Sequence, residues 1–227
     1  MCGHFALNYL NLIDIIERFS LTGPIDAIPG FEEGAANNYY PSHGNRHVYV
    51  PAIVAENGSR VLSVFRWDLV PHWWSKPLNE KKFASFNARR ESLDAKPAYK
   101  QAWQRRQRCI IPATAFFERP DKSKTDPDVK RSEHQISIRD ANVFSLAGIW
   151  DQASPPETET PVRSCTIITT EANAAIARIP HNRMPVILKE ADESGWLDPC
   201  VPPATAYGML WQYPEEACII DVQTRRE

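Results

Sequence analysis

An apolar stripe with helical spacing runs through residues 11–20, and it is formed by Leu12, Ile15, Ile16 and Phe19. This stripe predicts an amphipathic helix with one face toward a core. Residues 47–55 and 60–67 instead alternate with β-branched residues on either side of Asn57-Gly58. Asn-Gly between two such runs favours a tight turn, so a β-hairpin is expected here.

The rest of the chain also combines segments with helical spacing of apolar residues and segments with strand-like alternation. We expect a helix through Tyr99 and Trp103, a strand at 165–169, and a helix capped by Thr170 that runs to about residue 179. Further strands are expected at 108–111, 133–138, 142–150 and 186–188, the middle two forming a hairpin around Asp140-Ala141. The pattern predicts an α+β fold over residues 1–227, with a mostly antiparallel, barrel-like sheet flanked by a few helices in a single domain.

Composition narrows the class of protein. With 227 residues, of which 43% are hydrophobic, the chain can bury a core, and its net charge of −2 means that a polyanion must be held by a local basic patch. No run approaches the roughly 20 apolar residues of a membrane span, and no charged-then-apolar leader precedes Cys2, so we expect a soluble, cytoplasmic protein. The odd set of five cysteines has no close pairs, which favours a reduced protein without a structural zinc site.

The N-terminus Met1-Cys2-Gly3 carries candidate chemistry. Removal of Met1 would leave the α-amine and thiol of Cys2 on adjacent carbons, with unperturbed pKa values of about 8 and about 8.5. An aldehyde would form a Schiff base with the amine and then a five-membered thiazolidine with the thiol, whereas an ester or amide would meet only the thiol. The alternative is that Cys2 is a small apolar residue in an N-terminal strand.

Aromatic and polar side chains then cluster in two segments. Three of the seven tryptophans fall within residues 67–74. Adjacent Trp73 and Trp74 cannot both face inward on a regular strand, so one ring is expected at the surface, where it suits base stacking. Asn87 and Arg89 lie two positions apart and would share one face of an extended strand.

Three further positions carry candidate chemistry. Glu118 closes an apolar run, and a buried carboxyl has the raised pKa that a general acid needs, although a glutamate at a strand end can also face water. His181 lies in a proline-bounded turn where it can titrate and move protons, as few lone loop histidines do. The irregular stretch at 23–44 contains Asn37-Asn38-Tyr39-Tyr40-Pro41, and loops of this length tend to be functional or disordered.

Seven motifs together resemble the SOS-response-associated peptidase (SRAP) family, the abasic-site processing proteins. In chain order they are Met1-Cys-Gly3, Trp67-x-Leu-Val-Pro-x-Trp73, Asn87-Ala-Arg89-x-Glu91, Cys109-Ile-Ile-Pro-Ala-x-x-Phe-x-Glu118, Ala147-Gly-Ile-Trp150, Thr166-Ile-Ile-Thr-Thr-Glu-Ala-Asn173 and His181-x-Arg-Met-Pro-Val-Ile-Leu188. The resemblance covers residues 2 to about 200.

The resemblance implies four catalytic residues. Cys2, freed from Met1, would crosslink to the ring-opened aldehyde of an abasic site in single-stranded DNA as a thiazolidine. Glu118 would be the acid that helps to open the sugar and form the Schiff base. His181 would move protons and assist reversal, and Asn87 would position the reacting atoms. The family name also implies a thiol autopeptidase activity, and an abasic-site lyase activity is a further expectation. The sequence leaves open whether the crosslink is long-lived or a transient step toward strand cleavage.

The resemblance also implies a DNA path. Arg89 and Asn38 would hold flanking phosphates, while Trp73, Trp74 and Pro41 would stack on neighbouring bases or wedge between them. We expect abasic single-stranded DNA as the partner of a monomeric protein that binds no cofactor, metal or membrane and that associates with the bacterial nucleoid when on DNA.

Several positions depart from the commoner family pattern. His4 replaces an arginine and Asp68 a glycine, changes that could weaken phosphate contacts because a carboxylate repels DNA. Ala115 and Arg119 replace glycine and tryptophan, and Asn182 replaces an aspartate. The tail from about residue 207 is atypical, with Trp211-Gln212-Tyr213-Pro214 in place of the usual segment.

Two other functions remain open on the sequence. Glutamine amidotransferases also begin Met-Cys-Gly and use the thiol on an amide, so an N-terminal cysteine thiol hydrolase is one alternative. The other is a module that binds single-stranded or modified DNA without catalysis.

Overall fold

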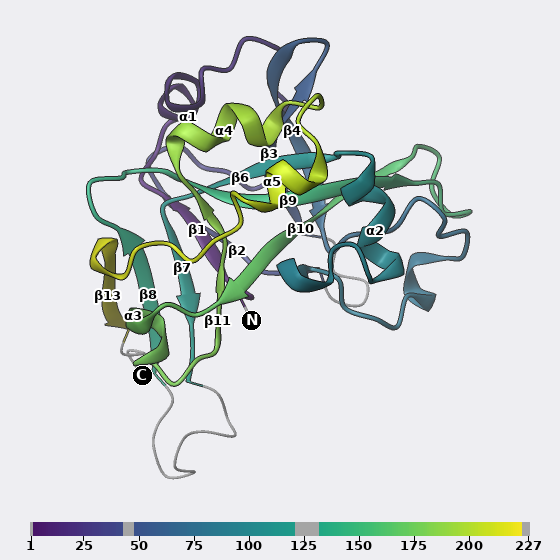
Figure 1. Cartoon of the computed structure of the whole chain (residues 1–227). Coiled ribbons are helices and arrows are strands. Elements are labelled where there is room, and N and C mark those ends of the chain that lie inside the picture. The colour runs from purple at the N-terminus through teal and green to yellow at the C-terminus, as the bar shows by residue number, and fades with distance from the viewer. Residues whose placement is uncertain (1, 43–47, 121–131, 224–227) are drawn as a thin grey trace.

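The computed structural model describes residues 2–42, 48–120 and 132–223 and has an α+β fold (Figure 1). The strands are β1 (Phe5–Asn8), β2 (Ala36–Tyr39), β3 (Tyr49–Glu56), β4 (Ser59–Trp67), β5 (Asn87–Arg89), β6 (Arg108–Ala113), β7 (Ala115–Glu118), β8 (Glu133–Ile138), β9 (Phe144–Ala153), β10 (Val162–Glu171), β11 (Arg183–Pro185), β12 (Ile187–Leu188) and β13 (Cys218–Gln223). The α-helices are α1 (Leu12–Phe19), α2 (Pro97–Gln104), α3 (Ala174–Ala177), α4 (Glu190–Leu197) and α5 (Pro203–Tyr207), and the short 3₁₀ turns are η1 (Leu78–Glu80), η2 (Arg90–Ser92) and η3 (Glu215–Ala217).

Within these ranges, five strands close into a barrel. Their order is β10-β4-β3-β6-β9, and β9 pairs again with β10. Neighbours are antiparallel except for β10 with β4, and β5 adds a second parallel pairing outside the ring. The prediction of a mostly antiparallel, barrel-like sheet flanked by helices is therefore confirmed.

A second, antiparallel sheet brings the N-terminus to the strand that carries Glu118. Its order over the described residues is β13-β8-β7-β1-β2. Phe5 of β1 pairs with Phe116 of β7, and the amide of Phe117 donates to the carbonyl of His4 at 3.0 Å. Because β1 and β7 run antiparallel, the start of β1 lies beside the end of β7.

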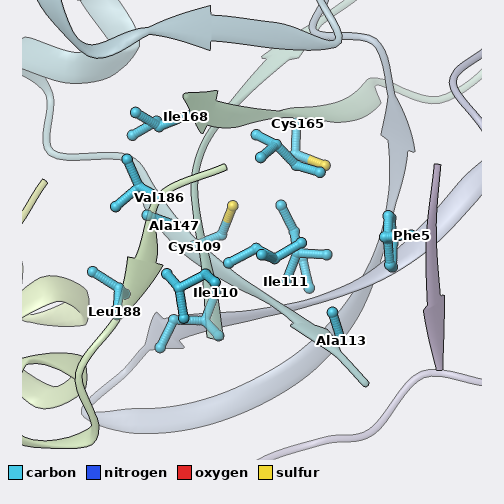
Figure 2. Packing of buried hydrophobic residues seen from close by; sticks show 14 of the residues in the cluster. Phe5, Cys109, Ile110, Ile111, Ala113, Ala147, Cys165, Ile168, Val186 and Leu188 are labelled. Atoms are coloured by element: carbon cyan, nitrogen blue, oxygen red, sulfur yellow. The ribbon is translucent and has the colours of Figure 1, made fainter. Parts of the chain in front are cut away.

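The barrel interior is apolar and closely packed. Figure 2 shows Cys109, Ile110 and Ile111 of β6 among side chains of β9, β10 and β12, with Phe5 of β1 to one side. Gly148 on β9 is required by this packing, since a Cβ there would lie 2.8 Å from the Cys109 sulfur. All five cysteines are unpaired.

Local sequence signals account for the two elements that were clearest in the sequence. Helix α1 begins after Asn11, whose amide donates to the Asp14 carboxylate at 2.7 Å, and it buries Ile15 and Phe19. Strands β3 and β4 form the predicted hairpin, with Asn57 at φ 50° and Gly58 at φ 78° in its turn. The predicted start of the first strand at residue 47 lies outside the described residues.

Several sequence expectations are wrong. Strands β8 and β9 do not form a hairpin, because β9 pairs with β6, β10 and β12 while β8 pairs with β7 and β13. Thr170 belongs to β10, and α3 is capped instead by Asn173, whose side chain accepts from the Ile176 amide at 3.0 Å. The stretch 23–44 is not wholly irregular, since β2 pairs along β1. Among the described residues, no helix is long and apolar enough to span a membrane.

Candidate active site

The described structure brings the four predicted catalytic residues to one end of the second sheet. Cys2 precedes β1, and Glu118 ends the adjacent strand β7. The Nε2 atom of His181, from the turn before β11, lies 3.1 Å from a Glu118 carboxyl oxygen. Asn87, on β5, donates its Nδ2 hydrogen to the Cys2 carbonyl at 2.7 Å.

Asn87 is fixed from two sides. Strand β5 pairs with β10 in the register Asn87 to Ile167, and the Tyr99 hydroxyl of α2 donates to the Asn87 carbonyl at 2.9 Å. Ala88 between Asn87 and Arg89 is buried, so these two polar side chains share the other face, as predicted. The Asn87 Oδ1 atom is buried and has no hydrogen-bond partner among the described residues. It is thus an acceptor at the Cys2 end of the site.

Glu118 is buried, with 3% of its surface exposed, and does not face water. Burial raises the pKa of its carboxyl from the usual 4.5 to about 8, so the group is mostly protonated at neutral pH. The prediction of a buried acid with a raised pKa is confirmed, and the solvent-facing alternative is wrong.

The hydrogen bonds of His181 indicate how a proton is shared with Glu118. Its Nδ1 atom lies 3.1 Å from the Arg119 carbonyl oxygen, which can only accept, so Nδ1 carries a hydrogen. In the neutral ring Nε2 is then the acceptor and faces the protonated Glu118 carboxyl. One proton can therefore move between Glu118 and His181 over a single hydrogen bond.

The Cys2 thiol is completely buried. Its sulfur donates to the His4 carbonyl at 3.7 Å. Burial, with the neighbouring Glu118 carboxyl, raises the pKa of this thiol well above its usual range. The sulfur is therefore protonated, as a thiol, at neutral pH. Met1 lies outside the described residues.

A hollow of about 300 Å³ opens beside this cluster. It is lined by Gly3, His4, Tyr40, Phe117, Glu118, Arg119, Glu133 and His181. Its wall was not predicted: the His4 ring stacks between Tyr40 and Phe117, at centroid distances of 4.3 and 3.8 Å. A larger hollow of about 790 Å³, around Asn8 and Thr114, contains none of the predicted site residues.

The predicted DNA-path residues lie on elements around the cluster. Asn38 on β2 accepts a hydrogen bond from His4 Nε2 at 2.8 Å, which joins it to the wall of the hollow. Trp73 is 45% exposed, and Trp74 is half-buried against Phe83, so one ring of the pair faces solvent as expected. Arg89 is exposed on β5.

Pro41 lines a separate hollow of about 500 Å³ together with Arg66, Asp68 and Lys81. Asp68 is buried here, and its carboxylate accepts from the Ser85 amide and hydroxyl at 2.8 and 2.9 Å and from Lys81 at 2.7 Å. Lys81 pairs with this carboxylate and Arg66 lies 3.8 Å from it, so two cations oppose its charge, and the effect of Asp68 on phosphate contacts stays a prediction. Likewise, His4 is 7% exposed and supports Asn38.

Some supporting residues could have been found from the sequence and others not. Tyr99 lies at the helical spacing of a buried face, and a buried tyrosine hydroxyl usually has a hydrogen-bond partner. A hydrogen bond from Tyr99 to a neighbouring segment could therefore have been predicted from the sequence. The pairing of Arg119 with Glu133 at 3.1 Å joins β7 to β8 across residues outside the described ranges, and no local signal predicts it.

The fold and the cluster define a class: a small barrel protein whose second residue is a cysteine beside a buried acid–histidine pair. The family described as SOS response associated peptidase (SRAP) matches residues 1–225, and the chain belongs to this family.

Named relatives agree with this family assignment, and a solved structure shares the fold. The chain is 34% identical over 200 residues to the abasic site processing protein YoqW of Bacillus subtilis, covering 88% of this chain and 81% of that protein. It is 29% identical over 194 residues to the abasic site processing protein HMCES of Xenopus tropicalis, covering 75% of this chain and 57% of the relative. A crystal structure of a Bacteroides thetaiotaomicron protein has the same fold, with a TM-score of 0.82, 23% identity and coverage of 97% of this chain and 91% of that one.

Proposed function

We propose that this protein processes abasic sites in single-stranded DNA by forming a covalent thiazolidine with Cys2. The observation that carries the proposal is the convergence of Asn87 on Cys2 at 2.7 Å and of His181 on Glu118 at 3.1 Å. The family membership and the names of the relatives support DNA with abasic sites as the substrate.

The proposed reaction begins with loss of Met1, which frees the Cys2 amine. An abasic sugar exists mostly as a closed ring. The protonated Glu118 carboxyl gives its proton to the ring oxygen while His181 takes the proton of the anomeric hydroxyl, so the bond between the ring oxygen and the anomeric carbon breaks and the aldehyde forms. The amine attacks the aldehyde carbon, and the resulting hydroxyl leaves as water after protonation, which yields the Schiff base. Asn87 holds the Cys2 carbonyl, and its Oδ1 offers an acceptor to the neighbouring amine.

The thiazolidine then closes by addition of sulfur to the Schiff-base carbon. The nitrogen keeps one of the amine protons and the thiol proton passes to the Glu118 carboxylate left by ring opening, so the adduct equals protein plus strand less one water. The reverse transfer, from Glu118 to the sulfur, opens the thiazolidine ring. Strand cleavage by a lyase route would start from the same Schiff base.

The thiol hydrolase alternative is less well supported by the site. A hydrolase acts through the thiolate, yet burial raises the pKa of the Cys2 thiol well above its usual range. The thiazolidine route needs the thiol only after the amine has reacted. A purely binding module would have no need of a buried acid beside Cys2.

The experiment that separates these functions uses Cys2 variants with an abasic single strand and an undamaged control. On a denaturing gel, wild-type protein without Met1 should give a slower-migrating band in which the abasic strand is covalently attached to the protein. Cys2→Ala should not give this band. Cys2→Ser should trap only a Schiff base, detected after borohydride reduction. Glutamine turnover by wild type with no retained strand would support the hydrolase instead. A Cys2→Ala protein that binds DNA and yields every wild-type product would support the module.

A further inference from the structure

The atypical C-terminal tail places a large aromatic ring at the surface. Trp211 is 61% exposed, although Leu210 before it is completely buried. Gln212 after it donates its side-chain amide to the Ala172 carbonyl at 3.1 Å. The indole therefore projects from a segment that is anchored on both sides. Tryptophan, tyrosine and arginine are enriched among the residues that contribute most to binding.

Arg90 backs this ring. Its guanidinium carbon lies 4.2 Å from the Trp211 ring centroid and 4.5 Å from that of Tyr207, so the cation stacks with both rings of the tail. Cation–π contacts of this kind hold an aromatic ring in a defined orientation. Trp211 thus presents an ordered aromatic surface.

The surface is continuous with the predicted DNA path. Arg90 directly follows Arg89, and Arg89 pairs with Thr169 in the β5–β10 register. The next residue, Thr170, lines a hollow of about 330 Å³ that also includes Arg90, Glu91, Glu171, Trp211 and Gln212. From the other side, the amide of Ala172 donates to the carbonyl of Asn182 at 2.9 Å, one residue from His181.

The charges in this hollow suit a base better than a phosphate. Glu91 is neutralised by Arg183 through contacts of 2.8 and 3.1 Å. Arg90 and Glu171 carry opposite charges, and Glu171 is exposed, where its carboxylate would repel a phosphate but accept from an exocyclic amino group. Arg89 would then bind the phosphate of the same nucleotide.

We propose that Trp211 is a stacking platform for one base of the single strand that enters the candidate active site. This inference rests on the proposed function for the position of the strand. Stacking on an aromatic side chain requires an unpaired base, so the occupant is single-stranded DNA. The platform extends the DNA path along β10 into the tail, beyond the residues implied by the family pattern.

The test measures binding of a fluorescently labelled, undamaged single strand by anisotropy, so that it does not depend on crosslinking. Trp211→Ala should weaken binding by about 5- to 150-fold, the range for one stacked base. Trp211→Phe should restore most of the affinity. Tyr9→Ala is the matched control, since Tyr9 is 76% exposed beside the separate hollow around Asn8 and should leave binding unchanged.

Two readouts separate stacking from a general loss of affinity. The salt dependence of binding should be the same in wild type and Trp211→Ala, because the indole neutralises no phosphate, whereas Arg89→Ala should reduce the slope by about one. Strands in which one nucleotide at a time is replaced by tetrahydrofuran, a sugar without a base that cannot open to an aldehyde and so cannot crosslink, should reveal one position at which this replacement weakens binding by wild type but not by Trp211→Ala.

Equal binding of the strand by wild type and Trp211→Ala would overturn the proposal that Trp211 stacks on a base. The same result is expected if this surface binds a protein partner instead of DNA. An altered salt slope in Trp211→Ala, or no position-specific effect in the base-removal series, would also overturn the proposal. The proposed function is judged separately by crosslinking of the abasic strand, so either proposal can fail while the other stands.

Discussion

At the scale of single residues, the central feature is the burial of Glu118. With 3% of its surface exposed and a pKa of about 8, the carboxyl has a proton to give at neutral pH. His181, at 3.1 Å, is the group that can receive and return it. The sequence predicted both residues, but the burial that sets this pKa comes from the packing of β7 between β1 and β8.

Replacing Glu118 by glutamine tests the acid. Glu118→Gln should slow single-turnover crosslinking by about 10²- to 10⁴-fold, because the amide has no acidic proton. The wild-type rate should fall as pH rises through about 8, where Glu118 ionises, and the variant should lack this decline. Glu216→Gln, at an exposed position, is the control and should react normally. A wild-type rate and pH profile in Glu118→Gln would refute the role.

The same burial makes a prediction about stability. The folded-state pKa of Glu118 lies above its usual 4.5, so the native state binds more protons than the unfolded state between pH 4.5 and about 8. The contribution of Glu118 to the free energy of unfolding should therefore be highest below pH 4.5. It should decrease as the pH rises from 4.5 to about 8. Glu118→Gln should flatten this dependence and stabilise the protein at pH 8 by on the order of 4 kcal/mol.

Urea unfolding of both proteins at pH 5 and pH 8 checks this expectation. The difference in unfolding free energy between variant and wild type should grow toward pH 8. A difference that does not change with pH would show that Glu118 is ionised in the native state or is equally protonated in both states.

At the scale of elements, the short strand β5 positions Asn87. It has three residues and depends on β10 for its pairing and on α2 for the hydrogen bond from Tyr99 at 2.9 Å. A three-residue strand with a parallel partner far along the chain has no strong local signature. The sequence predicted that Asn87 and Arg89 share a face, but not which element would hold them.

Tyr99→Phe tests this support. It should lower the free energy of unfolding by about 1–3 kcal/mol, because the Asn87 carbonyl loses its buried donor, and it should slow crosslinking through Asn87. Tyr39→Phe is a matched control, since the Tyr39 hydroxyl is buried without a hydrogen-bond partner in the described ranges and its loss should cost little. Equal effects of the two changes would show that the Tyr99 hydrogen bond does not matter.

Other elements show where local signals suffice. The turn at Asn57-Gly58 and the stripe of α1 were readable because each depends on neighbours in the sequence. Asp140, at φ 59°, gives a turn signal of the same kind, yet β8 and β9 enter different sheets. Closure of the barrel decides this, through pairing of β9 with β6 and β10, and such long-range pairing leaves no local pattern.

At the scale of the whole molecule, two sheets cooperate to form the candidate site. Strand β1 and strand β7 bring Cys2 to Glu118, while β5 and the turn before β11, both attached to β10 of the barrel, supply Asn87 and His181. The sequence predicted the fold class and the four residues, largely through resemblance to the family. It missed the wall formed by His4, Tyr40 and Phe117 and the buried network of Asp68, because both depend on contacts between distant segments.

The most direct test of the central claim is the intact mass of the protein after mixing with a single strand that carries one abasic site. Protein with and without Met1 should be compared, each with an undamaged strand as control. We predict an adduct equal to protein plus strand less one water, formed only by protein without Met1 and only with the abasic strand. An equal yield from protein that retains Met1, or no adduct when the Cys2 amine is demonstrably free, would contradict the account.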